Sequence, residues 1–377
     1  MSRNTGVAVV LANLAASFAL SGCATPSYYW QAIGGQLELW QKSRTIETVR
    51  LDPEVTPAVK AKLGAALDIR EFASRELDLP ANGSYRKYAD LKRAYVVWNV
   101  FASEEFSVAT KQWCFPIAGC VSYRGYFNPD GAKAYAETLS SQRYDVYVSG
   151  VPAYSTLGWF DDPILNTFIH YPETELARLI FHELAHQVVY IKDDSEFNES
   201  FAVTVEQEGV ERWLARHGSE TQRQSFDAMQ RRRADFFALV LEYRNRLADV
   251  YAAQAPVHDK RERKAHTLAE LQDEYRRIKA ERWGGFAGYD RWFEQPINNA
   301  TLASVGIYHQ LVPAFQAVLA QCGRDLPKFY EAVKRLALVP KAQRHLELAQ
   351  ALQRHRSVFT LGVPMNHDCT QWEGPKP

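Results

Sequence analysis

The stretch Phe181–Gln187 constrains the chain more than any other, because it contains the motif H-E-x-x-H. On a helix, His182 and His186 lie one turn apart on the same face, so both imidazoles can reach one ion. Zinc accepts imidazole nitrogen, and a catalytic zinc keeps three protein ligands and an open position for water. Glu183, beside the first histidine, can take a proton from that water. The motif therefore predicts a zinc-binding helix.

The residues around the motif predict a helix with two different sides. The helix begins at Pro172–Glu175, with acids in the first turn where the helix dipole favours them. At about 100° per residue, apolar side chains share one side and the two histidines project from the other. The apolar side consists of Ala177, Ile180, Phe181, Leu184 and Val188. Such a helix can pack on a core and still present both histidines to a cleft.

A third metal ligand is expected soon after the motif. The stretch Phe197–Ala202 follows His186 after a short connection, and a second helix carrying Glu199 can fold back to the histidines. Two histidines and a glutamate form one of the known catalytic zinc sets. Other acids compete for the role, namely Glu196, Glu206 and Glu208. Glu199 is favoured because it lies in the first turn of the second helix, near the returning chain. The alternative is a pair of buried, hydrogen-bonded histidines beside an unrelated acid.

Residues 1–22 predict a lipoprotein signal peptide that is not part of the fold. Arg3 gives a positive start, and Gly6–Leu20 is a mostly apolar run that is too short to span a membrane. The run ends in Leu20-Ser21-Gly22-Cys23, which is similar to a bacterial lipobox with Cys23 as the lipid acceptor. Ala24 follows the cysteine, which by resemblance to Gram-negative lipoproteins favours an outer-membrane anchor facing the periplasm. The alternatives are an ordinary signal peptide or a chance cysteine.

The cysteine count agrees with an oxidising compartment. The chain has five cysteines, which are Cys23, Cys114, Cys120, Cys322 and Cys369. Lipidation of Cys23 leaves an even number, and the simplest pairing joins Cys114 to Cys120 and Cys322 to Cys369. Neither spacing resembles a zinc knuckle. Unpaired buried thiols are the alternative, and the sequence alone does not choose the pairing.

The motif and the short segment that follows it resemble a known group of enzymes. His182–His186 followed by Asn198-Glu199-x-x-Ala202 resembles the gluzincin metallopeptidases, and N-E-x-x-A is similar to the zinc aminopeptidases. The signal-bearing chain is also similar to the bacterial family of predicted zinc aminopeptidase lipoproteins. The chain departs from the large zinc aminopeptidases in its short gap before Glu199 and in lacking G-x-M-E-N, the strand that anchors the free amine of the substrate. The departure weakens the assignment as an exopeptidase, and the zinc site survives it.

The resemblance also implies residues that handle the substrate. In zincin-type peptidases an edge strand lies before the zinc helix and pairs with the substrate backbone, and Tyr154–Trp159 is the candidate here. Gly158 would allow close approach of a substrate, and Asp161 or Asp162 is the candidate for binding a free amine. For these two acids, loop solvation or helix capping is the alternative. Gluzincins use a downstream tyrosine or histidine to stabilise the oxyanion, and Tyr308 is the candidate, with core packing or His309 as alternatives.

The sequence pattern predicts an α+β fold that is mostly α, with one metallopeptidase domain at 23–377. Residues 91–220 are expected to form a zincin-like core, with a small sheet against the zinc helix, and residues 284–377 a C-terminal helical part. Residues 221–283 are expected to form a long helical hairpin that turns at Pro256. Helices are expected at Tyr28–Trp40, Thr56–Leu77 and Asp130–Leu139, and strands at Ala94–Phe101, Cys120–Phe127 and Tyr144–Val148.

Taken together, these features predict a zinc-dependent aminopeptidase that is anchored by lipid in the bacterial envelope and acts on peptides. One zinc is expected on His182, His186 and Glu199, with Glu183 as the base. The alternatives are an endopeptidase that acts on envelope proteins and a non-enzymatic scaffold with structural zinc. Lys+Arg and Asp+Glu are 44 each, so the charge balance offers no case for a nucleic-acid partner. The sequence leaves the oligomeric state open.

Overall fold

The structure is a computed structural model that describes residues 26–115, 119–153, 155–306, 310–361 and 369. The expected signal peptide, Cys23 and Tyr308 lie outside these residues. The described part is mostly helical with small sheets, as the sequence predicts. None of the described helices is both long enough and apolar enough to cross a membrane.

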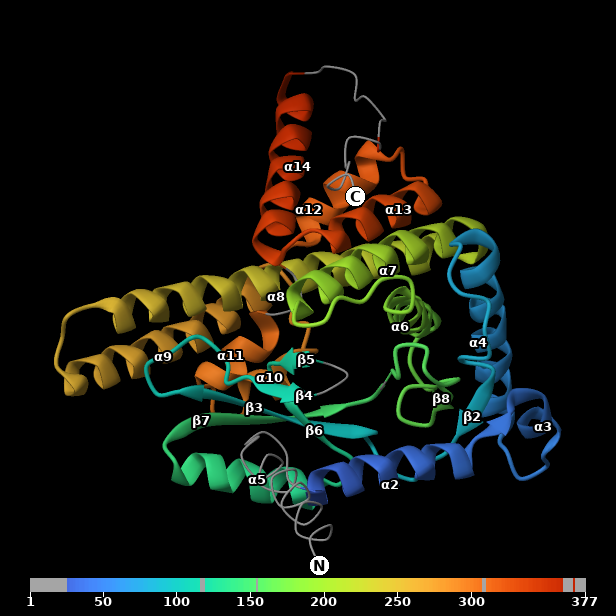
Figure 1. Cartoon of the computed structure of the whole chain (residues 1–377), viewed down its shortest axis with the longest axis horizontal. Helices are drawn as coiled ribbons and strands as arrows, with labels where there is room; N and C mark the ends of the chain where they lie inside the picture. The colour runs from blue at the N-terminus through green and yellow to red at the C-terminus, as the bar shows by residue number, and fades with distance from the viewer. Residues whose placement is uncertain (1–25, 116–118, 154, 307–309, 362–368, 370–377) are drawn as a thin grey trace, which may run out of the picture.

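The chain before the zinc helix alternates helices with short strands (Figure 1). The helices are α2 (Pro26–Lys42), α3 (Ile46–Leu51), α4 (Pro57–Glu76) and α5 (Pro129–Ser141). The strands are β1 (Arg44–Thr45), β2 (Lys87–Ala89), β3 (Val97–Glu104), β4 (Trp113–Phe115), β5 (Gly119–Val121), β6 (Arg124–Tyr126), β7 (Tyr144–Val151) and β8 (Ile164–Leu165). The structure splits the strand expected at Cys120–Phe127 into β5 and β6, because the chain leaves one sheet for another between them.

From the zinc helix onward the described chain is helical. The helices are α6 (Glu173–Ala185), α7 (Ser195–His217), α8 (Glu220–Ala252), α9 (Val257–Glu281), α10 (Asp290–Phe293), α11 (Asn299–Gly306), α12 (Val312–Gln321), α13 (Leu326–Leu338) and α14 (Lys341–Leu361). The expected hairpin is confirmed: α8 and α9 pack on each other, and Pro256 lies at the start of α9. Its apolar faces form a separate core with residues of α10 and α11.

The larger sheet has the order β6-β3-β7 and is antiparallel throughout. Helices α5 and α11 pack against β3 and β7 and lie on opposite sides of the sheet (Figure 1). The expectation of a small sheet against the zinc helix is therefore wrong for this sheet. Helix α6, which carries the H-E-x-x-H motif, packs mainly on α7 and α4. The apolar side of α6 is buried by these two helices, because Phe181 contacts Phe72 of α4 and lies against Gly209 of α7.

The main core joins segments that are far apart in the sequence. It takes residues from α4, α6 and α7 together with residues from α12, α13 and α14. Disulfides join Cys114 to Cys120 across the β4–β5 hairpin and Cys322 to Cys369 after α12. The core around helix α6 thus includes α4, which comes before residues 91–220 in the sequence, and α12–α14, which come after them.

The described residues of the expected edge strand, 155–159, do not form a strand. Strand β7 ends at Val151, and residues 157–160 form a turn. Gly158 lies in this turn with φ +83°, in the left-handed region that favours glycine. Ser155 and Thr156, just before the turn, donate hydrogen bonds to Asp162 rather than to a neighbouring strand. A turn stabilised in this way cannot supply the row of backbone groups that strand addition needs.

Candidate metal centre

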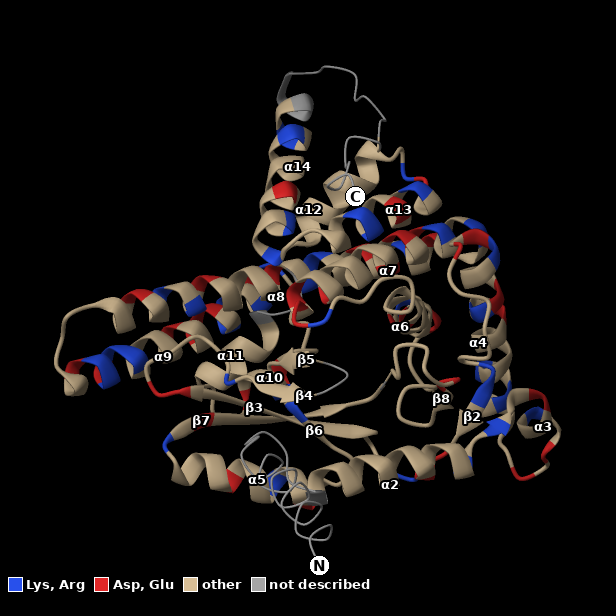
Figure 2. Cartoon of the chain, viewed as in Figure 1, with Lys and Arg blue, Asp and Glu red and all other residues tan. Residues whose placement is uncertain are grey.

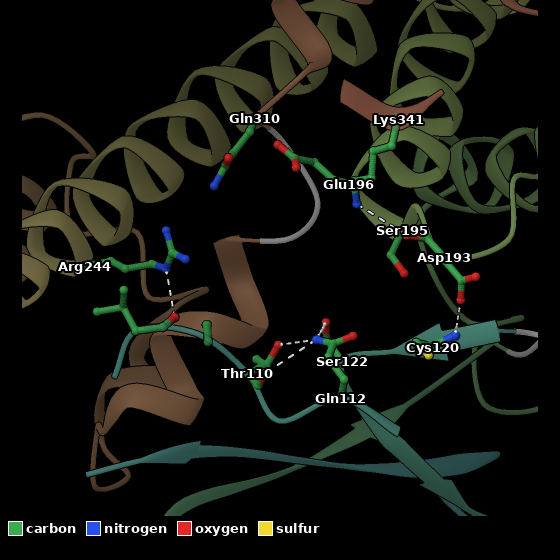
Figure 3. A pocket seen from close by; sticks show the side chains of 12 residues that line it. Thr110, Gln112, Cys120, Ser122, Asp193, Ser195, Glu196, Arg244, Gln310 and Lys341 are labelled. Atoms are coloured by element: carbon green, nitrogen blue, oxygen red, sulfur yellow. Dashed lines mark hydrogen bonds between the residues drawn. The ribbon is translucent and has the colours of Figure 1, made fainter. Parts of the chain in front are cut away.

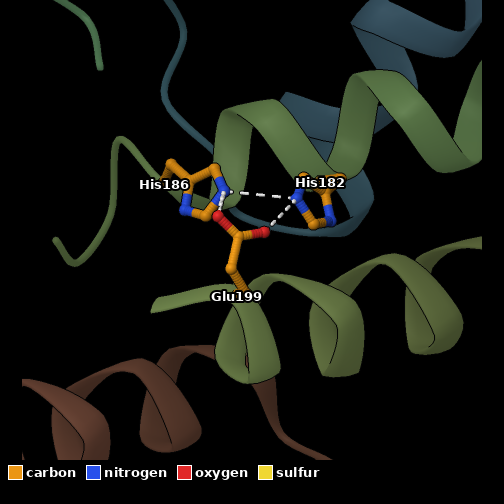
Figure 4. A group of neighbouring side chains, drawn as sticks. All are labelled: His182, His186 and Glu199. Atoms are coloured by element: carbon orange, nitrogen blue, oxygen red, sulfur yellow. Dashed lines mark hydrogen bonds and ion pairs between the residues drawn. The ribbon is translucent and has the colours of Figure 1, made fainter. Parts of the chain in front are cut away.

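Helices α6 and α7 bring three candidate ligands together. His182 and His186 project from one side of α6, and Glu199 points at both rings from the second turn of α7 (Figure 4). The two Nε2 atoms are 3.2 Å apart, and they lie 3.3 and 3.7 Å from the nearer oxygens of Glu199. Among the described residues, only these three form a group of histidine, cysteine and acid ligands close enough to hold a metal ion.

The spacing of these atoms fits zinc. With zinc–nitrogen bonds of about 2.0–2.1 Å, two ligand atoms on a tetrahedron lie roughly 3.3 Å apart. The three distances of 3.2, 3.3 and 3.7 Å are close to that edge length. Two imidazoles and one carboxylate also match a known catalytic donor set. The residues therefore fit a zinc ion that keeps one position open.

A second acid of α7 orients the first histidine. A carboxylate oxygen of Glu206 lies 2.9 Å from Nδ1 of His182, and Arg178 is ion-paired with the same carboxylate. Glu206 is 1 % exposed. Against the effect of burial, the charge of Arg178 and the hydrogen bond from His182 lower the pKa of Glu206 to about 2. Glu206 therefore stays ionised, holds the proton on Nδ1 and turns Nε2, the other ring nitrogen, toward the place of a metal.

The two histidines differ in their surroundings. Burial acts to lower the pKa of His182, but the hydrogen bonds to Glu199 and Glu206 outweigh it and raise this pKa. Burial lowers the pKa of His186, whose buried Nδ1 has no hydrogen-bond partner among the described residues. Since a metal binds only neutral imidazole, the ion would compete with a proton at His182 and with almost none at His186.

Glu183 is available as a base. It makes no hydrogen bond or ion pair with another described residue. Burial raises the pKa of Glu183 to about 7, with His182 opposing and the charges of Glu199 and Asp162 adding to the effect. A carboxylate with a pKa near neutrality can accept a proton and pass it on at physiological pH.

Of the two acids expected to bind the substrate, Asp162 is hydrogen-bonded within its own loop and Asp161 lies against Gly83. Asp162 is 3 % exposed and accepts hydrogen bonds from the Thr156 amide and hydroxyl, both at 2.9 Å. The Asp161 carboxylate lies against Gly83 so closely that a side chain there would have no room. Gly158 lies beside Gln187 at the end of the motif, where a Cβ would meet that side chain at 3.4 Å. The loop thus flanks the motif, and both carboxylate oxygens of Asp162 already accept hydrogen bonds within it.

A polar cavity of about 310 Å³ opens at the start of α7. Glu196, one turn before Glu199, projects into it toward Gln310, and Arg244 of α8 faces it from the opposite wall (Figure 3). Glu196 makes no hydrogen bond or ion pair with another described residue. None of the three candidate ligands lines this cavity, and Glu196, three residues before Glu199 on α7, is the link between the two.

Sequence reasoning missed two neighbours of the motif. Tyr85 is fully buried, its hydroxyl has no hydrogen-bond partner among the described residues, and the charge of Glu183 adds to the rise that burial causes in its pKa. Tyr190 packs edge-on to His186, with ring centres 6.4 Å apart. No local pattern marks Tyr85, whereas Tyr190 lies four residues after His186 and could have been placed on the same face.

Comparison with known proteins identifies the family. A model of the family described as "Putative aminopeptidase" matches residues 27–348, which include α6, α7 and all three candidate ligands. Comparison with curated proteins and with solved structures gave no match. Because the family match covers well over half of the chain, the protein belongs to the Putative aminopeptidase family.

Proposed function

We propose that the protein is a zinc-dependent aminopeptidase of the bacterial envelope. The observation that carries this proposal is the convergence of His182, His186 and Glu199 at distances of 3.2–3.7 Å. Membership of an aminopeptidase family supplies the reaction class. The donor set supplies the metal, because two histidines and a glutamate with an open position are typical of hydrolytic zinc.

The chain's own residues divide the work of hydrolysis. A zinc ion bound here would polarise the scissile carbonyl and lower the pKa of a bound water to roughly 7. Glu183 accepts the proton of the attacking water and passes it to the leaving amine. Glu206 keeps His182 in the tautomer that presents Nε2 to the site. Arg178 balances the charge of Glu206 within the protein.

Recognition of the free amine is assigned to Glu196. An aminopeptidase must hold an ammonium group near the scissile bond, and an ammonium group pairs best with a carboxylate. The other acids near the site are engaged: Glu206 pairs with Arg178, Glu175 with Arg233, Asp194 with Arg344, and Asp162 with its own loop. Among these five acids, Glu196 lines the cavity and makes no described hydrogen bond or ion pair, although its charge acts on Arg244 in the same lining.

The proposed location rests on the sequence Leu20-Ser21-Gly22-Cys23 and on the cysteine bonds. Two disulfides, Cys114–Cys120 and Cys322–Cys369, are what an oxidising periplasm favours. An acylated Cys23 would hold the protein on the membrane. Replacing Cys23 with serine should block acylation and shift the protein out of the membrane fraction or leave it unprocessed. Unchanged fractionation of a protein of mature size would refute the anchor.

One experiment tests both the zinc-dependent cleavage and the requirement for a free amine. Purified full-length protein is analysed for zinc and incubated with a peptide that has a free amine and with its N-acetylated copy. We expect about one zinc per chain and stepwise cleavage of the free peptide only. Equal cleavage of both peptides would identify an endopeptidase instead. Bound zinc without cleavage of either peptide would favour a structural metal, and absence of zinc would overturn the proposal.

A further inference from the structure

Helix α2 exposes an apolar face to solvent. Trp30 is 73 % exposed, Ile33 50 %, Leu37 44 % and Trp40 42 %, and their spacing places them along one side of the helix. The opposite side packs on the protein through Leu39, which is 2 % exposed. A surface helix normally turns polar residues outward, so α2 has apolar residues on the side where water would be expected.

The charges of α2 do not offset this face. Glu38 is ion-paired with Lys42 of the same helix and with Arg93, which lies between β2 and β3. Figure 2 shows that α2 carries few charged residues along its length, in contrast to α8 and α9. The face is therefore apolar and close to neutral, and whatever covers it binds by burial of apolar surface.

A second segment extends the apolar face. The ring of Phe160, which is 45 % exposed, meets Trp40 edge-on with centres 4.6 Å apart. Trp159 beside it is 69 % exposed. These two residues belong to the turn whose Gly158 lies against Gln187 at the end of the motif. The apolar face thus runs from α2 to the loop that flanks the metal centre.

We propose that this face, made of Trp30, Ile33, Leu37, Trp40, Trp159 and Phe160, lies in the interface of a lipid bilayer. Tryptophan is enriched at that depth, where its ring meets both apolar and polar surroundings. Cys23 lies only three residues before Pro26, and three residues span at most about 10 Å. The choice of a bilayer as the occupant rests on the proposed lipid anchor at Cys23, which would hold the start of α2 at the membrane surface.

The arrangement gives the enzyme a defined orientation. Helix α2 lies along one side of the molecule, and α13 and α14 lie on the opposite side (Figure 1). With α2 in the membrane plane, the loop at Trp159 and Phe160 also reaches the lipid, and the same loop contacts Gln187 at the end of the motif. Because the face carries no group of basic residues, its binding should not depend on anionic lipid.

A single fluorescent label tests the proposal in the full-length protein. Leu37→Cys places a thiol on the face, and Leu346→Cys places the control thiol on α14, where Leu346 is 58 % exposed. Each labelled protein is reconstituted into vesicles of phosphatidylcholine that carry a doxyl quencher on their lipid chains. We expect strong quenching of the label at residue 37 by the lipid quencher, protection of it from iodide in the water, and the reverse at residue 346.

Two outcomes would overturn the proposal. A label at residue 37 that iodide reaches as freely as the label at residue 346 would show that the face stays in water. A label that is shielded from iodide but not quenched by the lipid would show that a second copy or another protein covers it. When Trp30→Ser and Trp40→Ser are added to the labelled variant, lipid quenching at residue 37 should fall several-fold. Adding Leu338→Ser on α13 instead should leave the quenching unchanged.

The anchor and the enzyme activity are read separately in the same samples. The mass of the N-terminal peptide reports acylation of Cys23, and cleavage of the free peptide reports catalysis. An unacylated Cys23 would refute the anchor, while the label would still decide whether the face meets lipid. Quenching without peptidase activity would leave the membrane face established and the proposed function refuted.

Discussion

Nδ1 of His182 lies 2.9 Å from a carboxylate oxygen of Glu206, two helical turns beyond Glu199 on α7. One helix thus supplies both a candidate metal ligand and the acid that orients another ligand. Glu199 and Glu206 are seven residues apart, so they point to the same side of α7. The antiparallel packing of α6 on α7 then places Glu199 opposite both Nε2 atoms and Glu206 beside Nδ1 of the first ring.

Glu183 and Glu199 should fail in different ways when replaced. Glu183→Gln keeps the size of the side chain but loses the base, so zinc content should stay near normal and turnover should fall by roughly 100-fold or more. Glu199→Ala should weaken zinc binding, because two imidazoles alone hold the ion poorly. Zinc analysis after dialysis and peptide hydrolysis measure the two effects. Loss of zinc from Glu183→Gln, with zinc retained in Glu199→Ala, would exchange the two roles.

Glu206→Gln should reduce zinc affinity by about 10–100-fold, the usual effect of removing an acid that orients a metal-binding histidine. Competition with a chelator of known affinity gives the number. The matched control is Glu208→Gln, since Glu208 is an acid of the same helix that is 4 % exposed and pairs with Arg212 and Arg324 instead. Equal loss in both variants would mean that a general disturbance of α7 is responsible.

Glu196→Gln should lower kcat/KM for a peptide with a free amine by roughly 10–100-fold, as expected for the loss of a charge-assisted hydrogen bond. Zinc content should not change, because Glu196 is not a ligand in this site. Glu211→Gln, at an exposed acid of α7 that pairs with Arg324, is the control. Undiminished activity on the free peptide would remove Glu196 from amine recognition.

Gly209→Ala should destabilise the protein by about 1–3 kcal/mol, the usual cost of overpacking a core. A Cβ at Gly209 would lie 2.7 Å from both Leu77 and Phe181, where α7 crosses α4 and α6. In Gly64→Ala the nearest atoms are 3.8 Å away, so this variant should be neutral or gain up to about 1 kcal/mol from helix propensity. Urea unfolding of both variants checks the difference, and similar stabilities would contradict the tight crossing.

Asp162 predicts a pH dependence of stability. Burial raises its pKa from 3.8 to about 6, against the hydrogen bonds from Thr156 and Ser155. Because the folded pKa is raised, the charged form costs stability above pH 6, and this cost disappears as the pH falls to about 4. It amounts to at most roughly 3 kcal/mol. The stability of the wild type relative to Asp162→Asn should therefore rise between pH 7 and pH 4 in thermal unfolding at each pH, and a constant difference would contradict the shift.

The sequence determined the features that depend on local periodicity. His182 and His186 are one turn apart in any α-helix, and the apolar spacing around them already predicts which side is buried. The helices α2 and α4 and the hairpin of α8 and α9 likewise follow from apolar spacing and from proline at the breaks. Glu199 could be chosen as a ligand because the connection between the two helices is short, so that the second helix must return to the first.

Only the tertiary structure decided what depends on how the elements pack. Glu196, Glu199 and Glu206 are alike as sequence positions, and the position of α7 against α6 assigns one to the cavity, one to the ligand set and one to His182. Asp162 stabilises its own loop, because its carboxylate accepts hydrogen bonds from Ser155 and Thr156. The charge of Glu183 acts on Tyr85, which is far from it in the sequence. Such contacts follow from the packing distance and angle between elements, which no local spacing encodes.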